Sequence, residues 1–262
     1  MSSDSAKPLS DTTSAATMQP VRVWHATSST ERPGRIEATC QGWLSAEEIK
    51  RADRFRKPTS RNQHVVGRGM ARRLLGEDNV SPEDVCFAEE TYGKPYVVAP
   101  EAAKQPFNVA HTDGLVMCGV GNDPSHLLGV DVECLCRKTD PGLAERYFAR
   151  PEVDFLKRCC SERQRQDLFL RIWTLKESFI KAIGTGLQTP LADFAFEDIE
   201  KDRPRIRLLN PSLDDGRTWN FFSIEPRPGF IGAVAVATRC PNEAVSVDVK
   251  SFDDLILAAN GG

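Results

Sequence analysis

The sequence contains no long apolar run: no stretch approaches the roughly 18 consecutive apolar residues that a membrane-spanning helix needs, so we expect no membrane partner. It also lacks an excess of charge, because 34 Lys and Arg residues are matched by 37 Asp and Glu residues, a formal net charge of −3. The chain as a whole is therefore not a polycation built to coat nucleic acid, and any positive site must be local. What is present, 40% hydrophobic and 27% charged residues over 262 positions, is typical of one large or two small globular domains.

Cysteine is scarce as well, since eight residues are too few for a disulfide scaffold of this length. The sequence has no Cys-x-x-Cys pair, and neither Cys134-x-Cys136 nor the vicinal Cys159-Cys160 has the spacing of a zinc site. We expect all eight to be reduced, structural thiols. The first residues also lack the basic flank and apolar segment of a secretory signal, so a cytoplasmic location is expected.

The order of the expected elements favours an α+β fold with two halves. Helices are predicted over about 61–75 and 162–183, the second from an apolar stripe at steps of three and four, and hairpins over 115–133 and 221–238. We therefore expect a disordered tail over 1–20, an N-terminal α+β half over 21–127, a C-terminal α+β half over 128–250 and a C-terminal tail over 251–262.

Basic side chains are concentrated between residues 50 and 73, where nine of them accompany a single acid, Asp53. The concentration is compatible with a solvated helix face or with an anion site for phosphates. The nine residues are Lys50, Arg51, Arg54, Arg56, Lys57, Arg61, Arg68, Arg72 and Arg73.

Two carboxylates stand on one face of a predicted strand, Gly129-Val130-Asp131-Val132-Glu133, because strand side chains alternate. Held about 7 Å apart, Asp131 and Glu133 repel each other unless a cation lies between them. Oxygen ligands of this kind suit Mg²⁺, which commonly uses one or two carboxylates plus substrate phosphates. A solvent-facing strand with two acids is the structural alternative.

Two further segments carry candidate chemistry. On the predicted helix, Trp173, Glu177 and Lys181 form a ridge at i, i+4 and i+8, which could equally be an ordinary surface ion pair. In Phe107-Asn108-Val109-Ala110-His111-Thr112, the histidine lies among polar donors suited to an anionic oxygen, although a lone histidine is more often structural.

The segments FNVAHT (107–112), GVDVE (129–133) and WTLKESFIKAIGTGL (173–187), in this order and spacing, resemble the motifs of the 4'-phosphopantetheinyl transferases of the larger, surfactin-synthetase-activating type. Tyr92-Gly93-Lys94-Pro95 is a weaker fourth match. The resemblance implies transfer of the phosphopantetheine arm of coenzyme A to a serine of an acyl or peptidyl carrier protein, with release of 3',5'-ADP. It also implies a pseudo-dimer of two similar α+β halves, with the coenzyme A site in the cleft between them, and thus a monomer.

The resemblance also assigns roles to residues. It makes Asp131 and Glu177 ligands of Mg²⁺ with Glu133 as the third acidic position, and it makes Glu177 the group that takes the serine proton, itself or through water. The remaining assignments concern coenzyme A: Lys181 and Lys176 at the pyrophosphate, His111 at the coenzyme phosphates, Lys94 and Pro95 at the adenine, and Arg51, His64 and Arg68 around the 3'-phosphate.

The sequence departs from the family pattern at Ala110, where a serine is usual, and at Glu48, where a surfactin-type relative has a basic residue. Both departures concern the affinity for coenzyme A rather than the reaction class. The carrier protein is expected at an apolar patch, either around Tyr147, Phe148 and Phe155 or on the loop 184–196. Three other hypotheses stay open: a Mg²⁺-dependent nucleotide pyrophosphate hydrolase, an inactive coenzyme A or carrier-binding module, and nucleic-acid binding through residues 50–73.

Overall fold

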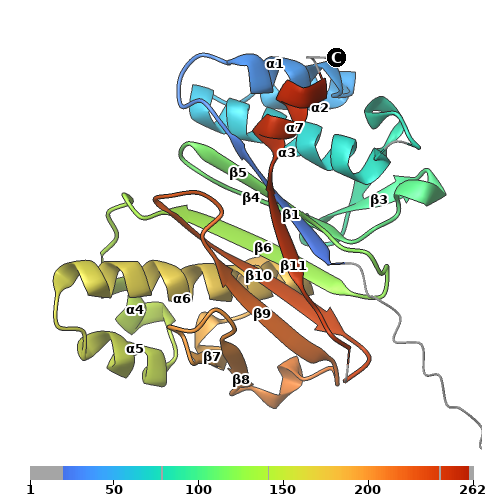
Figure 1. Ribbon diagram of the computed structural model, residues 1–262. Coiled ribbons are helices and arrows are strands. Elements are labelled where there is room, and N and C mark those ends of the chain that lie inside the picture. Colours follow the sequence, from blue (N-terminus) through green and yellow to red (C-terminus); the bar gives the residue numbers. More distant parts are fainter. Residues whose placement is uncertain (1–19, 78, 141, 242, 260–262) are drawn as a thin grey trace, which may run out of the picture.

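The structure is a computed structural model that describes residues 20–77, 79–140, 142–241 and 243–259. The tail expected over residues 1–20 lies almost wholly outside the described residues. Within them, no helix is both long and apolar enough to cross a membrane. The described residues form the mixed α+β fold that the sequence predicts, arranged as two sheets between two groups of helices (Figure 1).

The first group of elements is a four-stranded sheet covered by helices on one face. Its strand order is β11-β1-β5-β4, with β1 parallel to β11 and antiparallel to β5, and β4 antiparallel to β5. The bounds are β1 Val21–Thr27, β4 Phe107–Thr112, β5 Leu115–Val120, β11 Val247–Ser251, α1 Arg35–Gly42, α2 Ala46–Ala52, α3 Pro58–Gly76 and α7 Phe252–Ala259. A hairpin, β2 Cys86–Glu89 with β3 Pro95–Ala99, lies beside them, and short 3₁₀ turns occupy Pro82–Asp84 and Glu101–Ala103.

The second group is a three-stranded antiparallel sheet of order β6-β10-β9. Helix α6 packs along its outer face, with α4, α5 and a small hairpin beyond it. The bounds are β6 Leu127–Cys134, α4 Gly142–Tyr147, α5 Arg150–Lys157, α6 Glu162–Ile183, β7 Phe194–Glu197, β8 Arg205–Leu208, β9 Thr218–Ile224 and β10 Phe230–Thr238, with 3₁₀ turns at Gly186–Gln188, Leu191–Asp193 and Pro211–Leu213.

The inner faces of the two sheets pack on each other through a shared apolar core. Met117 and Leu115 of β5 meet Val130 and Val132 of β6 and Val234 of β10 in this core. The strand alternation predicted for β6 is confirmed, because Val130 and Val132 are buried between the sheets. Asp131 and Glu133 are buried too, on the other face, so they do not form a solvent-facing edge.

Three predictions about how the segments are arranged are wrong: one strand pairing, the C-terminal tail and one domain boundary. Residues 115–133 do not form a hairpin, since β5 pairs with β4 and β1 whereas β6 pairs with β10; the turn between β5 and β6 carries the chain from one sheet to the other. The tail expected over 251–262 is a helix for most of its length, because residues 252–259 form α7, which buries Phe252 and Ile256 in the core with α1 and α3; residues 260–262 lie outside the described residues. The boundary at 250 likewise fails, since β11 belongs to the first sheet (Figure 1).

Gly129 sets the distance between β6 and α6. A Cβ atom at this position would lie 2.0 Å from the Ser178 carbonyl oxygen and 2.4 Å from the Ala182 amide nitrogen, both backbone atoms of α6. No side chain can therefore be accommodated without moving the helix away from the strand.

We predict that Gly129→Ala lowers the free energy of unfolding by about 3 kcal/mol or more, because the backbone of α6 has to shift to admit the methyl group. Denaturant titration followed by circular dichroism measures this loss. The matched control is Gly42→Ala, where nothing lies within 4 Å of an added Cβ. This variant is expected within about 0.5 kcal/mol of the wild type, and equal stability of the two variants would contradict the close approach.

Candidate functional site

Asp131 of β6 and Lys181 of α6 form an ion pair where the strand and the helix pack together. The Lys181 ammonium donates to Asp131 Oδ1 at 2.6 Å. Asp131 is only 6% exposed, and among the described residues its second oxygen, Oδ2, is buried without a hydrogen-bond partner. A buried carboxylate oxygen left in this state indicates a position for a positively charged or hydrogen-donating ligand.

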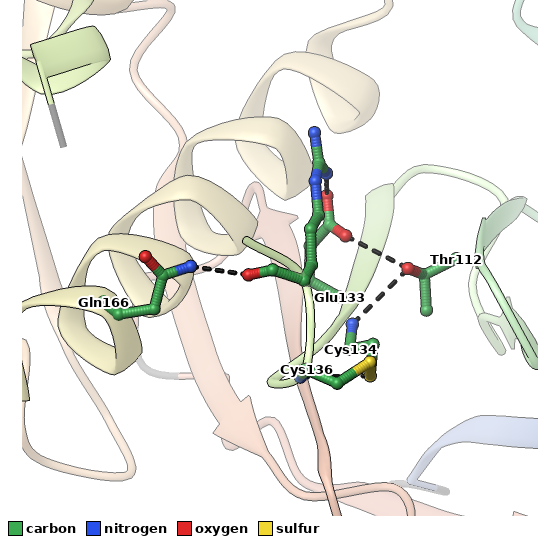
Figure 2. The surroundings of a disulfide bond; sticks show 6 residues. Thr112, Glu133, Cys134, Cys136 and Gln166 are labelled. Atoms are coloured by element: carbon green, nitrogen blue, oxygen red, sulfur yellow. Dashed lines mark hydrogen bonds and ion pairs between the residues drawn. A yellow bond between two sulfur atoms is a disulfide. The ribbon is translucent and has the colours of Figure 1, made fainter. Parts of the chain in front are cut away.

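Glu133 is held at the end of β6 by residues from two other segments. The Thr112 hydroxyl donates to Glu133 Oε2 at 3.1 Å and accepts the Cys134 amide at 3.4 Å, and Figure 2 shows it between the two. The other oxygen of Glu133 pairs with the guanidinium of Arg137. The Arg137 carbonyl in turn accepts from Gln166 Nε2 of α6 at 2.6 Å, which fixes this loop to the helix.

A disulfide bond joins Cys134, the last residue of β6, to Cys136 in the loop that follows (Figure 2). The expectation that all eight cysteines are free is therefore wrong for this pair. The turn at the end of the strand brings their Cα atoms to 5.2 Å, within the range that a disulfide spans. The other six cysteines are free, as expected.

The three carboxyl groups on β6 and α6 influence one another. Burial raises the pKa of Asp131, of Glu133 and of Glu177. The negative charge of Asp131 raises the pKa of both glutamates further, which shows that the three groups share one electrostatic environment. Lys181 and Arg137 offset part of this repulsion.

These residues suit a divalent cation held jointly with a substrate. Within the described ranges, no three His, Cys, Asp or Glu side chains are gathered into a preformed metal cage. The unpartnered Asp131 oxygen, with Glu133 and Glu177 beside it, supplies the few carboxylate oxygens that Mg²⁺ uses when substrate phosphates and water complete its coordination.

Glu177 and Lys181 open into a cavity of about 290 Å³ that both halves of the chain line. Residues of the β2–β3 turn and of β4 form one wall, and the C-terminal end of α6 forms the other. The lining residues are Tyr92, Gly93, Lys94, Pro95, Asn108, Val109, Glu177, Ile180, Lys181, Gly184 and Gly186.

A second cavity of about 300 Å³ contains the predicted basic residues Arg51, His64, Arg68 and His111. It continues from the first, because Gly93, Pro95 and Val109 line both. The structure therefore places Arg51 of α2 and Arg68 of α3 in one cavity and Glu177 and Lys181 of α6 in its neighbour, and the two cavities together are called the groove below.

Burial, followed by neighbouring positive charge, determines the protonation of the two histidines. Burial, followed by the charges of Arg68 and Arg51, lowers the pKa of His64 to about 4. Burial and the charge of Lys181 lower the pKa of His111 as well. Both imidazoles are therefore neutral near pH 7, and the positive charge of the groove comes from its arginines and lysines.

Lys94 lines the groove but uses its ammonium group elsewhere. Its Nζ donates to the carbonyls of Ala182 at 2.7 Å and Leu128 at 3.1 Å, so the β2–β3 turn is tied to α6 and β6. Burial lowers the pKa of Lys94 to about 8. Pro95, which follows it, lies in the wall of both cavities.

Lys176 does not reach the groove, and its expected contact with phosphates is wrong. Its side chain is fully buried on another face of α6, where Nζ donates to Glu152 Oε2 at 2.8 Å and to the carbonyls of Phe194 at 2.7 Å and Leu191 at 2.8 Å. Successive helix residues point about 100° apart, so a lysine next to Glu177 in sequence faces a different neighbour.

Sequence reasoning missed Arg137, Thr112 and Glu89 as members of the site. Arg137 and Thr112 hold Glu133, and Glu89 lies in the second cavity between Arg51 and Arg68. Two sequence signals could have indicated them: Thr112 ends the FNVAHT motif, and Glu89 is the single acidic residue of β2.

The aromatic residues expected to receive a carrier protein are divided between surface and core. Tyr147 is 41% exposed, whereas Phe148 is 5% exposed and stacks on Phe169 with ring centroids 5.1 Å apart. Phe155 packs partly buried against the same core. Only Tyr147 of the three is a surface residue.

Comparison with known proteins identifies the family of the chain. Residues 127–238, which contain β6, α6 and β10, match the family model of the 4'-phosphopantetheinyl transferase superfamily. The chain is 33% identical over 199 residues to 4'-phosphopantetheinyl transferase HetI of Nostoc sp., covering 74% of this chain and 78% of that protein. It is 30% identical over 231 residues to 4'-phosphopantetheinyl transferase ffp of Bacillus subtilis, covering 86% and 96% respectively.

The family membership predicted from the motifs is confirmed by these relatives: the chain belongs to the 4'-phosphopantetheinyl transferases. Sfp of Bacillus subtilis, also named as a 4'-phosphopantetheinyl transferase, is 26% identical over 219 residues that cover 82% of this chain and 90% of that protein.

We predict that Lys176→Met lowers the free energy of unfolding by about 3–5 kcal/mol, because it leaves the Glu152 carboxylate buried without its charge partner. The double variant with Glu152→Gln should recover part of this loss, since it removes the isolated charge. Denaturant titration of the single and double variants measures the coupling. A stable Lys176→Met protein with weakened coenzyme A binding would contradict the structural role.

Proposed function

We propose that the protein transfers the 4'-phosphopantetheine group of coenzyme A to a serine hydroxyl of acyl or peptidyl carrier protein domains, giving the holo-carrier and 3',5'-ADP in a Mg²⁺-dependent reaction. The observation that carries the proposal is the pair of adjoining cavities: Glu177 and Lys181 line one, with Lys181 paired to Asp131, whose second oxygen has no partner among the described residues, and Arg51 and Arg68 line the other. A donor with a pyrophosphate and a separate phosphate monoester matches this distribution of charge.

Asp131, Glu133 and Glu177 would hold the Mg²⁺ ion. When bound, such an ion supplies positive charge to phosphate oxygens. The residues of the chain then position the reactants and handle the proton, which is how most phosphoryl transfers are accelerated.

Glu177 is the proposed acceptor of the serine proton. It is the carboxylate that lines the cavity, and it would take the proton itself or through a water molecule, since a metal ligand has a lowered proton affinity. The serine oxygen forms the new bond to the phosphorus that carries the pantetheine arm, and the bond from that phosphorus to 3',5'-ADP breaks. Lys181 donates to the phosphate oxygens of the departing 3',5'-ADP and stabilises the charge that develops there.

We further propose that the two halves form a pseudo-dimer with the coenzyme in the cleft between them, acting as a cytoplasmic monomer. Each half sets a long helix, α3 or α6, against the outer face of its own sheet, which supports this reading. The cavity with Glu177 and Lys181 takes its walls from both halves, so a single chain would provide a complete site.

The proposal is tested by incubating the protein with coenzyme A, Mg²⁺ and a panel of apo carrier proteins from fatty-acid, polyketide and peptide synthases. We expect at least one carrier to gain the mass of a single phosphopantetheine arm, located on a serine by peptide mass spectrometry, and we expect EDTA to abolish the gain. Release of 3',5'-ADP at the same rate without any carrier would overturn the proposal in favour of a pyrophosphate hydrolase.

We predict that Glu177→Gln lowers kcat by about 10²–10⁴-fold, the usual contribution of a general base, because the amide cannot accept the serine proton. The matched control on the same helix is Glu162→Gln, an exposed carboxylate in the first turn of α6, which should retain wild-type turnover. Circular dichroism checks that both variants fold. Near-wild-type turnover of Glu177→Gln would show that Glu177 does not accept the serine proton.

A further inference from the structure

An acidic side chain occupies the basic end of the groove. Glu89, the last residue of β2, places Oε1 2.7 Å from Arg51 Nη1 and 3.8 Å from Arg68 Nη2. The two guanidinium groups that could receive an external anion are thus already paired with an internal one.

The second acid nearby, Glu48, is held differently. Its Oε2 accepts from the Ser45 amide at 3.0 Å and pairs with Arg72 at 2.9 Å, while its Oε1 lies 3.7 Å from Arg68. The Glu48 side chain is 13% exposed and serves as part of the N-terminal cap of α2, so it is fixed in the structure.

The Glu89 side chain, by contrast, can move away from the two arginines. Its side chain is 43% exposed, and within the described part of the chain its recorded ion pairs are with Arg51 and Arg68 alone. Exposed ion pairs of this type contribute little to stability, so exchanging the carboxylate for another anion costs the protein little.

The same cavity contains a second sign of a missing ligand. His64 Nε2 is buried with no hydrogen-bond partner in the residues that the structure describes. The imidazole is neutral because its pKa is lowered to about 4, so it offers hydrogen bonding without adding charge. Phe55, with its ring centroid 5.4 Å from that of His64, provides an apolar surface beside it.

A phosphate monoester is the kind of anion that can displace a carboxylate from two guanidinium groups. It carries about −1.5 to −2 charges near pH 7 and three acceptor oxygens, against a single charge on a carboxylate. Given the proposed function, on which this step rests, the donor provides such a group in the 3'-phosphate of its ribose, and so does the product 3',5'-ADP.

We propose that Glu89 is a specificity-determining residue that competes with the 3'-phosphate for Arg51 and Arg68. The carboxylate pairs with the arginines in the free enzyme, gives way when the 3'-phosphate enters, and pairs with them again when 3',5'-ADP leaves. Glu89 therefore limits the advantage of coenzyme A over dephospho-coenzyme A and weakens the hold on the bisphosphate product.

The test is direct binding, measured by isothermal titration calorimetry with 3',5'-ADP and with 5'-ADP, without a carrier protein. Glu89→Gln keeps the size of the side chain and removes its charge. We expect its affinity for 3',5'-ADP to rise about three- to fivefold, the value of one exposed ion pair, and its affinity for 5'-ADP to stay unchanged.

Two further variants make the result specific. Glu83→Gln removes an exposed carboxylate of the same half and should change neither affinity, which controls for net charge. In an Arg51→Gln background, the gain from Glu89→Gln should shrink, because the partner of the carboxylate is absent. If Glu89 served only to hold the β2–β3 hairpin in place, Glu89→Gln would change the affinities for 3',5'-ADP and 5'-ADP by the same factor. That change would be the same with and without Arg51.

The outcomes separate this inference from the proposed function. If the wild type binds 3',5'-ADP more tightly than 5'-ADP and Glu89→Gln leaves the ratio unchanged or lowers it, competition by Glu89 is overturned while the transferase function stands. If the wild type shows no preference for 3',5'-ADP, the assignment of this cavity to the 3'-phosphate is overturned together with the competition.

Discussion

The ion pair between Asp131 and Lys181 depends on the close packing of α6 on β6, and the rest of the groove is arranged around it. Because Gly129 has no side chain, the backbone of α6 can approach β6 closely. Glu177 and Lys181 therefore reach the carboxylates that β6 buries on its outer face. Thr112 of β4 then anchors Glu133 from the other sheet. A site built in this way needs both sheets, since neither one alone would present the acids and the basic residues to the same cavity.

Charged side chains at the candidate site pair with one another, as the near balance of 34 basic and 37 acidic residues in the chain permits. Lys181 pairs with Asp131, Arg137 with Glu133, and Arg51 with Glu89. A polyanionic substrate that arrives with its own cation can exchange partners with each pair, so that no charge is left alone at any stage. Pairing matters most for the buried carboxylates of Asp131 and Glu133, because an isolated buried charge is costly.

The sequence predicts well those features that local spacing determines. Helix α6 follows from its apolar stripe, and the strand alternation in β6 follows from the period of two. Features that depend on distant partners were missed: the pairing of β11 with β1, the separation of β5 and β6 into different sheets, and the burial of Lys176 on Glu152. Local pattern cannot distinguish a lysine facing a ligand from one facing a buried acid, because Lys181 and Lys176 lie on the same helix only five residues apart.

The contrast between Lys176 and Lys181 shows what physical property separates a structural from a functional lysine. The ammonium of Lys176 has three oxygen partners within the protein and no exposed surface, so nothing in its surroundings can be improved by a ligand. Lys181 is 28% exposed on its side chain, and its recorded partner is the single oxygen of Asp131, next to an oxygen that lacks any partner in the described chain. A ligand that supplies an anion to Lys181 and a cation to Asp131 satisfies both groups at once. Incomplete satisfaction of polar atoms, rather than charge itself, therefore distinguishes the lysine proposed to bind a ligand from the structural one.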